Sequence, residues 1–265
     1  MRAMVETTVV AGDRPGGRAR ALIGTPPVLL LASSCMGSAL AGVVVGGVGG
    51  RLVMRVSAVA ADDSRLGLIT DNGNEIGRIS GDGTLALMTF VGLAAGLATG
   101  LFLAALRTVL PRRLLPLWVS VAMLALFSPA VIDPANPDFT IVGNRVLNVT
   151  MFAALFPAFG CSAIWIAERF ERWLVQPPLV RLAPISVLGA GFGLVAGVAG
   201  LAVLAGVAGP LGAAVVVCVT AGGVAAAVGG PALARPARGA ALAALVVGVI
   251  AGTIGLVDDV LTIAG

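Results

Sequence analysis

Residues 182–234 read LAPISVLGAGFGLVAGVAGLAVLAGVAGPLGAAVVVCVTAGGVAAAVGGPALA, and these 53 consecutive positions contain no charged side chain. As one continuous helix the stretch would be ~80 Å long, more than twice the ~30 Å hydrocarbon core of a bilayer. Pro210, with Gly209 before it and Gly212 after it, supplies a break, because proline ends a helix and glycine permits a turn. The stretch therefore predicts two membrane-spanning helices.

The rest of the chain has the same apolar character. Of its 265 residues 58% are hydrophobic and only 11% are charged, and the mean hydropathy is +1.04. A soluble domain carries about 25% charged residues, so we predict an all-α integral membrane protein with seven transmembrane helices. Residues 1–27 are expected to form a disordered cytoplasmic tail, and 28–265 a single polytopic membrane domain. The expected spans are residues 28–50, 84–106, 114–132, 146–167, 185–205, 211–228 and 240–257.

Three residue types are absent, and their absence excludes several chemistries. The chain has no Lys, His or Tyr, and all 17 basic residues are arginine. Histidine catalysis, histidine ligation of haem or zinc, a lysine Schiff base and a P-loop lysine are thereby excluded. The three cysteines lie in apolar stretches, so we expect no disulfide, metal or cofactor. No basic patch is interleaved with aromatic residues, which argues against a nucleic-acid partner.

The arginines also predict an orientation. With the N-terminus in the cytoplasm, 12 of the 17 arginines and only four carboxylates fall inside, and every outside segment is neutral or acidic. This N-in, C-out arrangement agrees with the excess of basic residues on cytoplasmic loops. Arginine without lysine, together with abundant Ala, Gly and Val, is typical of GC-rich bacterial genomes, so we expect a bacterial plasma membrane.

The first external segment, residues 62–83, is the longest polar stretch between spans. Asn72 and Gly73 stand between two short runs containing Leu, Ile and Thr, which predicts a β-hairpin with a type I′ turn. A second interpretation is an external cation site, because carboxylate oxygens bind Ca²⁺. The carboxylates for such a site are Asp62, Asp63, Asp71, Glu75 and Asp82. Their spacing matches no EF-hand loop, so a solvated hairpin remains the favoured interpretation.

Asp62 and Asp63 carry one resemblance to an enzyme family. They lie in the external segment after the first span, and their position is similar to that of acidic residues in the first external loop of polytopic lipid-linked sugar transferases. The resemblance covers these two residues and implies a catalytic role for them.

Glycine and serine recur at four-residue spacing in several expected spans. Such stripes let helix backbones approach closely, so they predict helix packing within the molecule or association with another membrane subunit. The glycines that we assign to packing are Gly42, Gly46, Gly50, Gly92, Gly96, Gly100, Gly189, Gly193 and Gly197.

Charged residues also gather at the external ends of the spans. Arg51 and Arg55 follow the first span at i,i+4, Arg145 opens the fourth, and Asp258 and Asp259 close the seventh. Charges at the hydrocarbon edge are costly unless paired, so we expect Arg–Asp pairing, with Arg51 and Asp258 as the first candidates. The alternative is a vestibule that binds an ion or ligand.

These features favour a non-catalytic scaffold or accessory subunit that binds the bilayer lipid, another membrane protein or a second copy of itself. No ionisable side chain is expected in the middle of a span, and this weighs against transport. A small permease or channel with a charged external vestibule is the alternative, and a sugar-transferase-like enzyme using Asp62 and Asp63 is the lesser one.

Overall fold

The computed structural model describes most of the chain after the N-terminal tail. The described residues are 27–61, 67–69, 75, 80–136, 138–141, 144–174, 191, 194–195, 197–200, 202 and 209–265. They are almost all helical, and no strand occurs among them. The expected tail and most of the expected span at 185–205 lie outside this part of the chain.

Five helices in the described part are long and apolar enough to cross a membrane. They are Pro27–Val59, Gly81–Val109, Arg145–Leu174, Gly209–Val228 and Pro231–Ala264. The first comprises α2 (Pro27–Ala41), η1 (Gly42–Gly49) and α3 (Gly50–Val59), and the second comprises α4 (Gly81–Ala86), η3 (Leu87–Ala94) and α5 (Ala95–Val109). The last three are α8 (Arg145–Leu174), α11 (Gly209–Val228) and α12 (Pro231–Ala264). The chain is therefore a multi-pass helical membrane protein.

Helix α6 is shorter than the expected third span. It covers Leu115–Phe127, and a 3-10 turn, η4 (Ser128–Ala130), follows it. At 1.5 Å per residue its 13 residues extend only ~20 Å, less than the ~30 Å hydrocarbon core. Pro129 contributes to the early end, because proline has no N–H to donate to the carbonyl one turn earlier.

The expected hairpin is not supported by the structure. An isolated antiparallel bridge joins Ile69 and Glu75, and the described residues around it form no strand. Asn72 and Gly73 lie outside the described residues. An isolated two-stranded hairpin has marginal stability in water. A sequence typical of a tight turn is therefore not enough to predict two paired strands.

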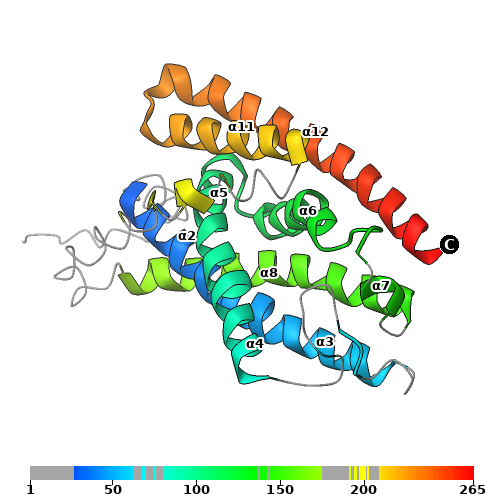
Figure 1. The fold of residues 1–265 in the computed structure, drawn as a ribbon. Coiled ribbons are helices and arrows are strands. Elements are labelled where there is room, and N and C mark those ends of the chain that lie inside the picture. Colours follow the sequence, from blue (N-terminus) through cyan, green and yellow to red (C-terminus); the bar gives the residue numbers. More distant parts are fainter. Residues whose placement is uncertain are drawn as a thin grey trace, which may run out of the picture.

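The helices run between two ends of the bundle (Figure 1). The start of α2, the end of α8 and the turn from α11 to α12 lie at one end, and the C-terminus lies at the other. In the same view α8 lies between α3 and the α11–α12 pair, while α5 crosses α2. The main core joins α5 and α6 through side chains such as Phe102 and Phe127, whose rings meet edge to face at 6.0 Å.

Glycines allow α2 and η1 to contact the second spanning helix through their backbones. A Cβ on Gly96 would lie 2.5 Å from Ser38 O, and one on Gly100 would lie 2.8 Å from Cys35 Cα. A Cβ on Gly42 would overlap the carbonyl of Gly92. Four of the glycines that we assigned to packing therefore lie at this crossing.

The four-residue stripe does not continue through η1. The buried residues of this π-helix are Gly42 and Gly47, whereas Gly46 is half-exposed. A π-helix bonds residue i to residue i+5, so the buried face advances by five residues instead of four. Gly50 has only Leu87 nearby, 3.5 Å from a Cβ position.

The last glycine stripe lies largely outside the described residues. Gly189 and Gly193 are not among them, whereas Gly197 is. A Cβ on Gly197 would lie 2.8 Å from Leu101 Cβ. The described residues 197–200 therefore pack against α5.

Candidate functional site

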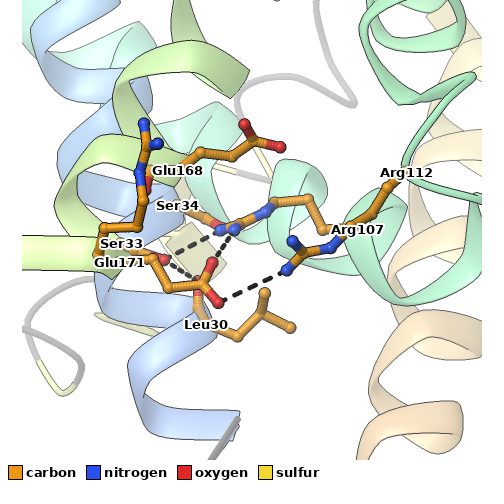
Figure 2. Close-up of polar contacts among 8 residues, drawn as sticks. Leu30, Ser33, Ser34, Arg107, Arg112, Glu168 and Glu171 are labelled. Carbon is orange, nitrogen blue, oxygen red and sulfur yellow. Dashed lines mark hydrogen bonds and ion pairs between the residues drawn. The ribbon is translucent and has the colours of Figure 1, made fainter. Parts of the chain in front are cut away.

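The described part of the chain holds one buried ionic network, at the bundle end where α2 begins and α8 ends. Arg107, near the end of α5, is its centre (Figure 2). Its Nη1 donates to Ser33 Oγ and to Ser34 Oγ, both at 2.9 Å, and its Nη2 donates to the Glu171 carboxylate. One guanidinium thus joins α2, α5 and α8. We call Arg107, Glu171, Ser33 and Ser34 the arginine clamp.

The two serines of the clamp lie within the apolar part of α2. Both are fully buried, about two turns after the start of the helix at Pro27. Ser33 Oγ donates to Leu30 O at 3.1 Å, so its lone pairs remain to accept from Arg107. A hydroxyl that satisfies its own donor within the helix is therefore also an acceptor for a neighbouring helix.

Glu171 serves two arginines. Its Oε2 faces Arg107, and its Oε1 lies 3.7 Å from Nη2 of Arg112. The side chains of Arg107 and Glu171 are only 4% and 9% exposed, whereas that of Arg112 is 50% exposed. The clamp is therefore a buried pair with one half-exposed cation at its edge.

The burial of this pair determines what it can do. Removing one partner of a buried ion pair leaves an uncompensated charge and costs about 3–5 kcal/mol. Arginine stays protonated in proteins, so Arg107 cannot relay protons. The geometry suits the joining of three helices rather than acid–base chemistry.

The predicted outer cluster lies at the opposite end, and its members are arranged less closely. The described residues contain no ion pair between Arg51 and Asp258, and α8 lies between their helices in Figure 1. Arg145 instead reaches the end of α12, where its Nη1 lies 3.4 Å from Ile263 O. Asp258 and Asp259 lie within α12, which continues to Ala264.

Arg51 and Arg55 lie on the helical continuation of the first span, in α3. Arg51 is half-buried, and its Nε has no hydrogen-bond partner. Arg55 is exposed. The structure therefore places Arg51 and Arg55 at i,i+4 on one helix, as expected. It shows no pairing of Arg51 with Asp258 among the described residues.

The predicted external cation site lies mostly outside the described residues. Asp62, Asp63 and Asp71 are not among them, while Glu75 and Asp82 are exposed. Within the described part of the chain, no three His, Cys, Asp or Glu side chains come together in a way that would hold a metal ion. Asp82 lies in the first turn of α4, which Ser80 caps by accepting from the Gly83 N–H at 3.2 Å.

The arginine clamp was missed by the sequence reasoning, which counted Arg107 and Glu171 among the cytoplasmic charges without predicting a contact between them. The available signal was Arg107 itself, since it precedes Pro111 by a full helical turn and so belongs to the apolar helix. The adjacent serines in the first span were a second signal, because polar side chains in a membrane helix pack towards partners.

Comparison with protein families, characterised proteins and solved structures finds no match to this chain. The fold defines its class as a multi-pass helical membrane protein.

Proposed function

We propose that the chain is a non-catalytic scaffold or accessory subunit that binds another membrane protein or lipid. The observation that carries this proposal is the arginine clamp, which joins α2, α5 and α8 through buried charges. Alternating access requires groups of helices to rock against one another. A buried pair that costs several kcal/mol to break opposes such movement, so the geometry favours a rigid platform over a permease.

We also propose seven crossings with the clamp end in the cytoplasm. Among the described residues, this end carries seven arginines and two glutamates: Arg107, Arg112, Arg113, Glu168, Arg169, Glu171, Arg172, Arg235 and Arg238. Basic residues favour the cytoplasmic side. Helix α8 ends at the clamp end and α11 begins towards the opposite end, which supports a further crossing between these two helices.

Reporter fusions test this topology. Fusions after Arg113 and Arg238 should report cytoplasm, and a fusion after Gly265 should report the exterior. A cytoplasmic C-terminus would contradict the count of seven.

Co-purification tests the scaffold. The tagged full chain, extracted from its own membranes in two mild detergents, should retain a membrane component in constant stoichiometry. Arg107→Gln should release most of that component because the platform loosens, whereas the exposed Arg169→Gln on the same end should retain it. Solute flux in reconstituted vesicles that depends on Arg107 would overturn the proposal in favour of a permease.

A further inference from the structure

Two exposed arginines stand beside the clamp in the turn from α5 to α6. Arg112 and Arg113 follow Pro111, and Leu114 N donates to Pro111 O at 3.0 Å to close the turn. Both side chains are exposed. The turn therefore holds two consecutive arginines that are exposed at the clamp end.

Positive charge is in excess at this place. Glu171 faces both Arg107 and Arg112. Glu168 is the other acidic residue near Arg107, and its carbonyl accepts from Arg172 Nε at 3.3 Å. Among the described residues the clamp end therefore carries more arginines than carboxylates, seven against two. An excess charge at the hydrocarbon edge is stabilised by a counter-charge of opposite sign.

Apolar side chains adjoin the two arginines. Leu114 and Leu117 at the start of α6 are 46% and 61% exposed. A surface with guanidinium groups beside exposed leucines matches a molecule that carries an anionic head and hydrocarbon tails. It matches a free anion less well, because a free anion has no apolar part to cover the leucines.

We propose that Arg112 and Arg113 bind the phosphate of an anionic phospholipid whose acyl chains cover Leu114 and Leu117. Guanidinium groups bind phosphate oxygens through paired N–H donors. Arg112 faces Glu171 through one nitrogen at 3.7 Å, so its other N–H groups remain for a phosphate. The inference names lipid as one partner of the proposed scaffold, and it rests on that proposal in placing this turn at the membrane surface.

Thermal melting of the full-length protein tests this site. The protein is melted in zwitterionic phosphatidylcholine micelles with and without added phosphatidylglycerol. Phosphatidylglycerol should raise the Tm of the wild type by roughly 4 °C, as expected for two arginines near an anionic surface. The double variant Arg112→Gln/Arg113→Gln should lose most of this rise. The matched variant Arg235→Gln/Arg238→Gln, which loses equal charge at the start of α12, should keep it.

Three results would overturn the site: no rise in the wild type, an equal loss in the matched variant, or an equal rise with inorganic phosphate, which would identify a soluble anion. If the double variant does not fold, Arg112→Lys/Arg113→Lys keeps the charge and removes the planar fork, and it should lose about half of the rise. If phosphatidylglycerol does not change the Tm of the wild type but the protein retains a protein partner, the lipid site is wrong and the scaffold proposal stands. If the protein binds the lipid but also carries solute flux that depends on Arg107, the scaffold proposal is wrong and the lipid site stands.

Discussion

The two ends of the helix bundle carry charged side chains in different ways. At the clamp end Arg107 donates to two serines and a glutamate and is almost fully buried. At the opposite end Arg145 reaches one backbone carbonyl at 3.4 Å, and Arg51 Nε has no hydrogen-bond partner. The ends contain similar residue types, but the buried ion pair of the described residues lies at the clamp end.

The difference shows that charge at a membrane edge does not by itself imply pairing. The opposite end has more carboxylates among the described residues than the clamp end, yet Asp258 and Arg51 form no ion pair. What distinguishes the clamp is convergence, because α2, α5 and α8 bring their polar side chains to one point. We therefore expect the stability of the protein to depend unequally on its two ends.

The strongest test of this comparison replaces one arginine at each end. Arg107→Gln should lower the free energy of unfolding in micelles by about 3–5 kcal/mol, because Glu171 stays buried without its principal partner. Arg145→Gln should cost less than about 1 kcal/mol, since an exposed arginine loses one long contact. Unfolding curves measured in denaturant at fixed detergent give both values. Equal losses for the two variants would break the comparison.

A second test asks whether backbone contact, rather than the clamp, holds α2 against α5. Gly96→Ala should destabilise the protein by about 1–3 kcal/mol, because the new methyl group meets the backbone of Ser38, which cannot move aside. Gly255→Ala on α12 has nothing within 4 Å of its new Cβ. That control should change stability by no more than about 1 kcal/mol. A loss at Gly96 larger than that of Arg107→Gln would make the crossing the main contact.

The smallest effect is expected from the serines. Ser33→Ala or Ser34→Ala alone should cost about 1 kcal/mol or less, because Nη1 of Arg107 keeps the other hydroxyl. The double variant should cost more than the sum of the two, since the last acceptor on α2 is then lost. The same unfolding measurement in a double-mutant cycle reports this difference. Additive losses would mean that Arg107 does not share the two hydroxyls.

Much of the fold follows from the sequence, because a chain segment inside a bilayer has to satisfy its own backbone hydrogen bonds and therefore forms a helix. Apolar stretches of sufficient length predict spanning helices, and five such helices are present in the described residues. The expected break near Pro210 corresponds to the start of α11, where Gly209 has a φ of +68°. Helix ends are harder to predict: α12 begins at Pro231 rather than 240, because Arg235 and Arg238 are good helix formers that composition assigns to loops.

The clamp could not be located from the sequence in the same way. Arg107 is separated by 64 residues from Glu171 and by 74 from Ser33, and no local pattern encodes which helix faces meet. The π-helical turns of η1 add to the difficulty, since they shift the buried face from Gly46 to Gly47. Periodicity read at 3.6 residues per turn fails wherever the turn is wider.

These wider turns set the angular phase between the two halves of the first spanning helix. η1 lies between Ser33 and Ser34 on one side and Arg51 and Arg55 on the other, and it packs against η3 of the second spanning helix. Removing one residue from η1 would shorten the helix by only ~1.5 Å, but it would rotate α3 by ~100° relative to α2. The direction in which Arg51 and Arg55 point thus depends on one extra residue in the wide turns that precede them.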